Sequence, residues 1–314
     1  MNKKTKEFRE QISAEFLKTL EEAKASGKSL NWQEPWFNGL KPRNGQYNRP
    51  YKGINQVFLR FVTNKNNYDD PRWYTFNQIK KMGCHLQKET KGTLVEYWYP
   101  WDITDGKKLK WSEVKEAEEK NHKLTLYAYY NTVFNGSCIT GLSKYEPETA
   151  IEPVEPDMLI EKVSKALDVE IIEDEMDRAY YSSVFDKIHL PKQKYFKSSA
   201  DYNATALHEL THSTGHEKRL NRELKNFFGS EEYAFEELVA EIGCAMTSQF
   251  LKEGLGQTQF ENSAAYLDSW IKAVKENADV FPKAVKLAEQ ASDYMLESAQ
   301  IIKKGENNET SQIV

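Results

Sequence analysis

The most constraining feature of this chain is the sequence HELTH at residues 208–212, an HExxH pattern inside the helix-forming segment ALHELTHSTG. Residues four positions apart share one face of a helix, so the imidazoles of His208 and His212 can bind one metal ion. Glu209 lies on the adjoining part of the helix, within reach of a water molecule at the metal. The pattern predicts a zinc site with Glu209 as general base.

A third ligand is required, because catalytic zinc usually takes three protein ligands and leaves one position for water. His216 follows His212 by four residues, but Gly215 predicts that the helix ends before it. The metzincin pattern HExxHxxGxxH would need histidine at Lys218, so a metzincin site is excluded. The third ligand must therefore be sought elsewhere in the chain.

The remaining candidates are acidic residues of the segment YAFEELVAEIGCAM, namely Glu236, Glu237 and Glu241. Glu237 and Glu241 are four residues apart and share a helical face. In the gluzincin arrangement the first acid of such a pair binds zinc, and the second accepts a hydrogen bond from a ligand histidine. We expect Glu237 to be the ligand and Glu241 to orient a histidine, with the neighbouring glutamates as alternatives.

Such a site predicts peptide hydrolysis. Zinc lowers the pKa of its water to about 7 and polarises a carbonyl, while Glu209 transfers the proton to the leaving amine. The developing oxyanion needs a further donor, for which the candidates are His216, Arg219 and Tyr233.

Charge divides the chain into two parts. Residues 1–145 carry 25 Lys+Arg and 16 Asp+Glu, a net charge of +9, whereas residues 146–314 carry 18 and 32, a net charge of -14. Residues 143–157 contain three prolines and five acids, as a linker does. We expect an N-terminal domain over 1–145, a second domain over 146–302 and a disordered tail over 303–314.

The periodicity of apolar residues indicates an α+β protein. In the first half it predicts an opening helix over 7–25, a short helix over 75–82, and a hairpin whose strands, TLVEYWYPW and LTLYAYYNTVF, flank a charged insertion over 107–123. The stretch QVFLRFV fits either a helix or a strand. The second half is expected to be mostly helical with a small sheet: a helix over 158–167, strands at VEIIED and over 180–190, then helices over 200–214, 231–253, 262–278 and 281–302.

The basic half has the composition of a surface that binds single-stranded DNA. Six of the seven tryptophans lie there among Arg and Lys, and aromatic faces stack on bases while cations contact phosphates. We expect Trp98 and Trp101 to fill the core. The candidate DNA-binding residues are Trp32, Trp36, Arg43, Arg49, Tyr51, Lys52, Asn55, Arg72, Trp73 and Lys81.

Three widely spaced cysteines exclude a disulfide framework or a cysteine-based zinc module. No apolar run approaches the ~18 residues of a membrane span. We therefore expect a cytoplasmic protein with no membrane partner.

Both halves resemble the ArdC family of plasmid antirestriction proteins. The shared stretches of the first half are WQEPW, RPYKGIN, DPRWYTFNQI, KGTLVEYWYP and YNTVFNGSCITGL; those of the second are DKIHLP, Phe196-x-Ser198-x3-Tyr202, HELTHSTGHEKRLNR and YAFEELVAEIGCAM. The resemblance implies a single-stranded-DNA-binding domain before a zincin-like metallopeptidase domain, and protection of mobile DNA from restriction endonucleases. Its metal residues correspond to His208, His212 and a glutamate of EELVAE. The chain departs from the family pattern at Thr211, which is polar, and in the insertion over 107–123.

Two functions follow from these features. The first is a zinc metallopeptidase that is anchored on single-stranded DNA and cuts a protein associated with that DNA. The second is a non-enzymatic protein that coats DNA and carries a structural zinc ion. The intact Glu209 favours the first, because a structural site does not need a carboxylate beside the water position.

Overall fold

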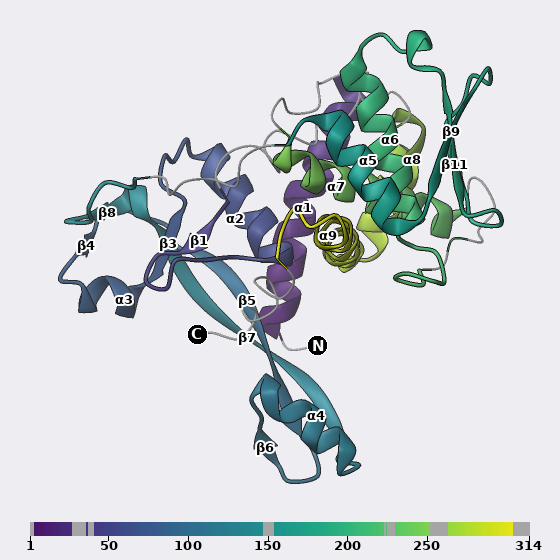
Figure 1. Ribbon diagram of the computed structural model, residues 1–314. Helices are drawn as coiled ribbons and strands as arrows, with labels where there is room; N and C mark the ends of the chain where they lie inside the picture. Colours follow the sequence, from purple (N-terminus) through teal and green to yellow (C-terminus); the bar gives the residue numbers. More distant parts are fainter. Residues whose placement is uncertain are drawn as a thin grey trace. The chain divides into compact units, whose positions relative to one another are not determined.

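The computed structural model describes residues 3–26, 36, 41–146, 154–222, 224, 230–251 and 263–303 (Figure 1). The chain is an α+β protein with two domains. Its described residues form two compact units. Unit 1 consists of residues 3–8 and 41–146; unit 2 consists of the rest.

Unit 1 is built on a six-stranded sheet with the order β2-β1-β3-β7-β5-β6. Among the described strands of this sheet, only the β1–β3 pair is parallel. A separate two-stranded sheet joins β4 and β8. The strands are β1 (Arg43–Asn44), β2 (Arg49–Pro50), β3 (Arg72–Thr75), β4 (His85–Leu86), β5 (Thr93–Asp102), β6 (Lys107–Lys108), β7 (Leu124–Asn135) and β8 (Ile139–Thr140). The helices are α2 (Gly53–Lys65), α3 (Phe76–Lys81) and α4 (Trp111–Glu119).

The stretch QVFLRFV, ambiguous in sequence, belongs to helix α2. Every residue from Gln56 to Phe61 is buried, including the polar Gln56 and Arg60, so the stretch shows no alternation that would separate helix from strand in the sequence. Asn55 fixes the helix to β5, since its side-chain amide donates to Glu96 O (2.6 Å) and its carbonyl accepts from Glu96 N (2.9 Å). Helix α2 thus covers the edge of β5 that β7 leaves open.

The predicted hairpin is confirmed as the long antiparallel pair β5–β7, which pairs from Thr93–Val133 to Asp102–Leu124. The insertion contains β6 and α4, which lie at the far end of the hairpin, away from the other strands of unit 1 (Figure 1). The expectation that Trp98 and Trp101 fill the core is wrong. Trp98 is 36% exposed and Trp101 is partly exposed, because no further layer of the described part of unit 1 covers this end of the ribbon.

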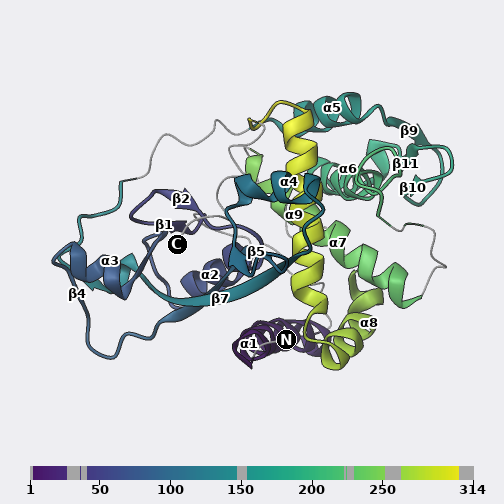
Figure 2. The same cartoon turned by 90° about the horizontal axis from the view of Figure 1, so that it is seen from below.

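Unit 2 combines helices with a three-stranded sheet of order β10-β11-β9, in which β9–β11 is parallel and β10–β11 antiparallel. Its strands are β9 (Glu170–Asp174), β10 (Tyr180–Ser182) and β11 (Lys187–Pro191). Its helices are α5 (Pro156–Leu167), α6 (Ser199–Ser213), α7 (Glu231–Thr247), α8 (Ser263–Glu276) and α9 (Val280–Ser298). Helices α7 and α9 lie side by side (Figure 2), and the core joins α5, α6 and α9 to the sheet.

Helix α7 ends at Thr247, earlier than the expected Glu253, and a 3-10 turn over Ser248–Phe250 follows. Part of the expected linker lies outside the described residues. All residues of the expected tail after Lys303 lie outside them as well. None of the described helices is long and apolar enough to cross a membrane.

The opening helix, α1 (Lys3–Ser26), spans nearly the predicted range. From Arg9 onward it clusters with unit 2, although the sequence assigns it to the N-terminal domain. Phe16 stacks on Phe281 of α9 at 3.8 Å between ring centroids, and Trp36 packs edge-on against both rings. Ser13 also donates a hydrogen bond to Ala278 O (2.6 Å). From Arg9 onward, the apolar side chains of α1 therefore add to the core of unit 2.

Candidate metal centre

Helix α6 positions the two histidines. Ser198 caps its N-terminus by accepting from Asp201 N (3.2 Å), and buried Leu207 and Leu210 anchor the helix in the core of unit 2. With that face fixed, His208 and His212 project together from the opposite side, one turn apart. Their Nε2 atoms are 3.1 Å apart.

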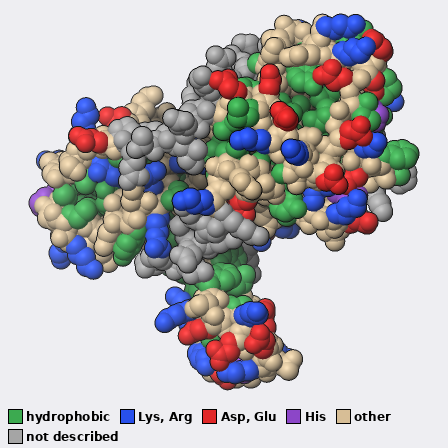
Figure 3. Space-filling model, in the orientation of Figure 1, with side chains coloured by type: hydrophobic (Ala, Val, Ile, Leu, Met, Phe, Trp, Pro, Cys, Tyr) green, Lys and Arg blue, Asp and Glu red, His purple; other side chains and the backbone are tan. Residues whose placement is uncertain are grey.

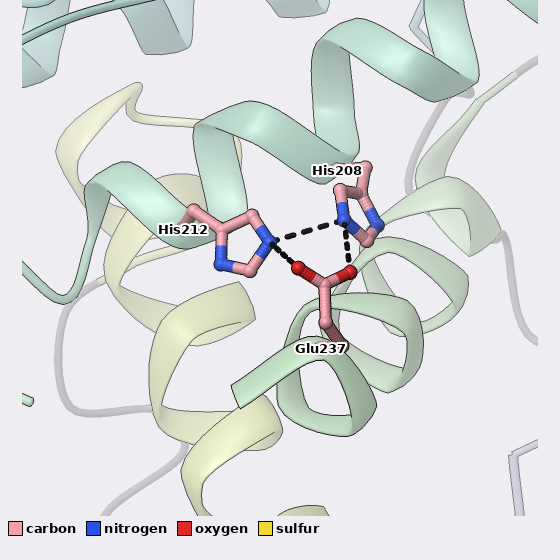
Figure 4. Close-up of side chains that lie close together, drawn as sticks. All are labelled: His208, His212 and Glu237. Atoms are coloured by element: carbon pink, nitrogen blue, oxygen red, sulfur yellow. Dashed lines mark hydrogen bonds and ion pairs between the residues drawn. The ribbon is translucent and has the colours of Figure 1, made fainter. Parts of the chain in front are cut away.

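Glu237 of α7 completes a group of three side chains (Figure 4). One carboxylate oxygen lies 3.4 Å from His208 Nε2, and the other lies 3.4 Å from His212 Nε2. Ser230 caps this helix by accepting a hydrogen bond from Tyr233 N (3.1 Å). The helix begins at Glu231, so Glu237 lies in its second turn. The predicted ligands thus converge from two helices.

The carboxylate and the imidazoles favour each other's charged forms. Burial acts to lower the pKa of both histidines, but Glu237 raises that of His208, and Glu236 and Glu237 together raise that of His212, so both pKa values lie above the ordinary range. Burial raises the pKa of Glu237, yet the two histidines hold it well below its usual range. The site is therefore strongly polar and attracts a cation once the imidazoles lose their protons.

The spacing of the donor atoms fits a metal ion. Bonds of ~2.0–2.1 Å at tetrahedral angles place two ligand atoms about 3.3 Å apart. The two Nε2 atoms are 3.1 Å apart, each carboxylate oxygen lies 3.4 Å from one of them, and one ligand atom from each residue can be chosen with all three within 4.8 Å of one another. Two imidazoles and one carboxylate are also the ligand types of catalytic zinc sites that keep a position for water.

Glu236, rather than the expected Glu241, is the carboxylate that contacts the second ring nitrogen of a predicted ligand histidine. Glu236 Oε1 lies 3.3 Å from His212 Nδ1, and Arg222 donates to both oxygens of Glu236 (2.8 and 3.1 Å). Arg222 also donates to Thr211 O and Thr214 Oγ1. Glu241 is 3% exposed and acts on His208 through its charge.

Glu209 is 7% exposed, and the backbone N–H of Tyr181 in strand β10 is among the groups that act on its carboxylate. Burial raises its pKa, whereas His208, His212 and the Tyr181 N–H act to lower it. The carboxylate is therefore held between the histidines and the sheet, as a general base beside the metal needs to be.

Family models match both parts of the chain. The N-terminal domain of anti-restriction factor ArdC matches residues 6–134, and a zincin-like metallopeptidase domain matches residues 159–286. The metal-free crystal structure of the antirestriction protein ArdC from plasmid R388 is 31% identical, with a TM-score of 0.71 over 94% of this chain and 99% of that one. This chain belongs to the ArdC family of antirestriction proteins.

Other relatives agree with this assignment. The Mn(II)-bound structure of ArdC from R388 matches with a TM-score of 0.68 and covers 93% of this chain. DNA primase TraC from Escherichia coli is 34% identical over 305 residues. That match covers 93% of this chain but only 27% of TraC, and a second TraC is matched over 19% of its length.

Among the three oxyanion candidates of this ArdC-family chain, Tyr233 is the one whose pKa responds to the ligand carboxylate. Burial and then Glu237 raise the pKa of its hydroxyl. His216 instead accepts from Lys218 N (3.2 Å). Arg219 is committed to Asp186, Ser213 O and Leu167 O, which tie the β10–β11 turn to the ends of α6 and α5.

Tyr266 of α8 is a residue that the motif reasoning missed. Its ring lies 6.0 Å from that of Tyr233, and it stacks on Trp270, which donates to Ala234 O (2.7 Å). Burial and then Glu237 raise the pKa of Tyr266. The only sequence signal was helical spacing from Trp270, so the two tyrosines are recognised as a pair only through the packing of α7 and α8.

The aromatic residues predicted to stack on DNA are mostly buried. Trp36 and Trp73 are 1% exposed and Tyr51 is 6% exposed, so their rings are covered by protein rather than available to bases. Each of these rings fills a core, because the burial of a large aromatic side chain removes much apolar area from water. Trp32 lies outside the described residues.

The polar candidates divide between structural and surface positions. Arg72 pairs with Asp70 (2.6 Å) and donates to Ser143 O, while Asn55 holds α2 on β5 as described above. Arg43 donates to Asn48 (2.7 Å) and is only partly exposed. Arg49 and Lys52 are also partly exposed, and Lys81 is exposed at the end of α3. Arg43, Arg49 and Arg72 lie on the adjacent strands β1, β2 and β3, next to the buried rings of Tyr51 and Trp73 in the chain and in the sheet.

Proposed function

We propose that this ArdC-family protein is a zinc-dependent peptidase that acts beside single-stranded DNA held by its N-terminal domain. The observation that carries the proposal is the convergence of His208, His212 and Glu237 with Glu209 adjacent to them. The combination supplies three ligands and a general base, and a purely structural metal site would need only the ligands.

A divalent ion held by these three side chains would polarise a peptide carbonyl and acidify a water molecule. Glu209 would accept a proton from the attacking water as the new C–O bond forms. It would then deliver that proton to the leaving nitrogen as the C–N bond breaks. Tyr233, beside Glu237, would donate a hydrogen bond to the carbonyl oxygen as negative charge develops on it.

The edge strand β10 would align the substrate. Among the described strands, β10 pairs on one side only, with β11, and the backbone N–H of its Tyr181 helps to lower the pKa of Glu209. An extended peptide can add to such an edge through main-chain hydrogen bonds. This arrangement would deliver a peptide bond to the catalytic base with little dependence on side chains, which suits a protein substrate in extended form.

We propose Zn²⁺ as the ion because two imidazoles and a carboxylate are the usual donors of a catalytic zinc site. The Mn(II)-bound structure of the R388 relative makes manganese the competitor. Cellular availability and geometry, rather than affinity alone, select between them. To distinguish the two ions, each is titrated into chelator-treated protein, and peptide hydrolysis is then measured at equal metal occupancy.

The deciding experiment is Glu209→Gln in the full chain, loaded with Zn²⁺ or Mn²⁺. We expect unchanged metal content, loss of hydrolysis of fluorescein-labelled casein in the presence of single-stranded DNA, and loss of protection when unmethylated DNA is transferred by conjugation into a restricting host. His189→Ala, which alters a histidine paired with Asp174 outside the site, is the matched control. Full protection by the metal-loaded Glu209→Gln variant would instead establish the non-enzymatic DNA-coating function.

DNA binding is tested separately by fluorescence anisotropy of single-stranded and duplex oligonucleotides with the full chain at two salt concentrations. We expect tighter binding to the single strand and weakening as salt rises, since the described part of unit 1 after residue 40 carries 18 Lys+Arg against 11 Asp+Glu. An absence of binding at low salt would remove the DNA part of the proposal and leave the peptidase part standing. Cytoplasmic action, where such DNA enters, belongs to the same proposal.

A further inference from the structure

The two faces of the hairpin β5–β7 differ in the number of their aromatic rings, since Trp98 and Tyr130 lie on one face and a longer series of rings lies on the other. The register pairs Tyr97 with Tyr129, Tyr99 with Tyr127 and Trp101 with Thr125, and directly opposed residues lie on the same face. Five aromatic rings therefore share one side of the ribbon, hereafter the aromatic face: Tyr97, Tyr99, Trp101, Tyr127 and Tyr129.

The five rings form a continuous series. Tyr97 and Tyr129 stack at 5.3 Å between centroids, Tyr129 is 5.8 Å from Tyr99, Tyr99 is 6.1 Å from Tyr127, and Tyr127 meets Trp101 edge-on at 5.8 Å. One end of the series enters the core of unit 1 at Tyr97, which is 9% exposed. The other end is open, since Tyr127 is 50% exposed.

Charge also distinguishes the two faces. The β5–β6 pairing places Lys108 opposite Trp101 on the aromatic face and Lys107 opposite Asp102 on the other face. The Lys108 ammonium lies 4.5 Å from the Tyr99 ring centroid and 5.5 Å from that of Tyr129. The acids of the paired strands, Glu96 and Asp102, both belong to the opposite face. The aromatic face thus carries a cation and no carboxylate of these strands.

The far end of the hairpin is held rigid without using the aromatic face. Asp102 accepts from the backbone N–H groups of Thr104 and Asp105 and contacts His122 Nδ1 at 2.6 Å. Lys107 pairs with Asp105 at 2.7 Å. Figure 3 shows hydrophobic side chains gathered on the hairpin just before this charged end. The turn is thus fixed by polar contacts, so ring stacking is not its only support.

We propose that the aromatic face binds single-stranded DNA by stacking bases on its rings, with Lys108 contacting phosphate. The inference rests on the proposed function and assigns its DNA-binding surface to residues that differ from those expected from sequence. Aromatic rings on a sheet typically stack two or three bases. A single strand is the occupant because its base faces are free to stack, whereas those of a duplex are covered by neighbouring base pairs. The positive excess of unit 1 complements the DNA backbone.

The test compares residues on the two faces. Tyr127 and Leu126 are adjacent and equally exposed, at 50% each, but lie on opposite faces. Binding of the full chain to a fluorescein-labelled thymidine 20-mer is followed by anisotropy. We expect Tyr127→Ala to weaken binding about 5- to 150-fold, the range for loss of one stacked base. Leu126→Ala should change it less than about twofold, a loss too small for a stacked base.

The lysines supply a second matched pair. Lys108→Ala should reduce the salt dependence, with the slope of log K against log salt falling by about 0.7, whereas Lys107→Ala should not. Tyr127→Leu keeps an apolar side chain on the hairpin but removes the ring, and should bind as weakly as Tyr127→Ala. Tyr127→Phe keeps the ring and should bind like the unaltered protein.

The outcomes separate this inference from the proposed function. If the unaltered protein binds the 20-mer but Tyr127→Leu and Lys108→Ala bind it equally well, the aromatic face is not the DNA site, although the proposed function stands. Equal weakening by Leu126→Ala and Tyr127→Ala would also overturn the assignment, because it would reflect the hairpin's stability. If the unaltered protein does not bind the 20-mer, the DNA part of the proposed function fails together with this inference.

Discussion

Glu236 Oε1 lies 3.3 Å from His212 Nδ1, on the side of the imidazole ring that faces away from Glu237. A carboxylate in this position accepts a hydrogen bond from Nδ1–H, which leaves Nε2 without a proton and free to bind a metal. Arg222 holds the same carboxylate through both oxygens and is itself anchored to the end of α6. The orientation of His212 is thus set by residues outside the HExxH motif.

Glu236→Gln should lower metal affinity about 10- to 100-fold, the usual cost of losing a carboxylate behind a ligand histidine. Titration of Zn²⁺ into chelator-treated protein measures the change. Glu241→Gln, on the same helix and also buried, is the control and should have the smaller effect. A larger loss from Glu241→Gln would show that Glu241 orients the histidines after all.

Tyr233→Phe should slow hydrolysis of fluorescein-labelled casein at least tenfold while the zinc content stays unchanged, because one donor to a developing oxyanion contributes about 10²- to 10³-fold. Tyr202→Phe removes a hydroxyl that donates to Glu173 in the same unit and should leave the rate unaltered. Equal rates for Tyr233→Phe and the unaltered protein would exclude the hydroxyl from catalysis.

The Asp186–Arg219 pair should make part of the stability of unit 2 depend on acid pH. Burial acts to raise the pKa of Asp186, but hydrogen bonds from Arg219 and Tyr181 lower it from 3.8 to about 2. Folding therefore favours the ionised carboxylate, so its contribution is complete above about pH 4 and is lost as the pH falls toward 2.

Asp186→Asn should accordingly destabilise the protein at pH 7 by about 3 kcal/mol, because it leaves the guanidinium of Arg219 without its negatively charged partner. It should also flatten the loss of stability between pH 4 and pH 2, which urea unfolding at several pH values measures. Glu22→Gln, in the exposed Lys18–Glu22 pair, should change neither. If Asp186→Asn lost unfolding free energy between pH 4 and pH 2 as steeply as the unaltered protein does, the role assigned to Asp186 would be wrong.

Gly243 lets α7 approach α6 closely at Thr211. A Cβ at position 243 would lie 2.6 Å from Thr211 Cγ2. Thr211 is fully buried, and its hydroxyl donates to Leu207 O. Gly243→Ala should therefore cost about 1–3 kcal/mol of unfolding free energy.

The double variant Gly243→Ala, Thr211→Ser tests that explanation by removing the methyl group that would clash. Thermal or urea unfolding should show that Thr211→Ser costs less in the Gly243→Ala variant than in the unaltered protein, with a coupling of about 0.5–3 kcal/mol. Strict additivity of the two changes would place the cost elsewhere, for example in the contact with Ala288 O.

The sequence by itself determined the features that depend on local spacing. The i, i+4 relation puts His208 and His212 on one side of any helix that contains them, and Glu209 must then lie beside them. The alternation of β-branched and aromatic residues likewise determines a hairpin over β5 and β7. Such relations hold within a few turns of helix or one strand pair, so no distant contact is needed to predict them.

Only the tertiary structure decided which of several similar residues meets a partner from elsewhere in the chain. Glu236 and Glu241 both lie near Glu237 on α7, and the position of His212 and Arg222 selects Glu236. Tyr266 joins Tyr233 because α8 packs on α7.

The fates of the tryptophans were decided in the same way. Trp36 is buried against Phe16 and Phe281, whereas Trp98 lies exposed on the hairpin. Composition shows that aromatic residues are present, but burial depends on which elements pack over each ring. That packing is a property of the whole fold and has no local signature in the sequence.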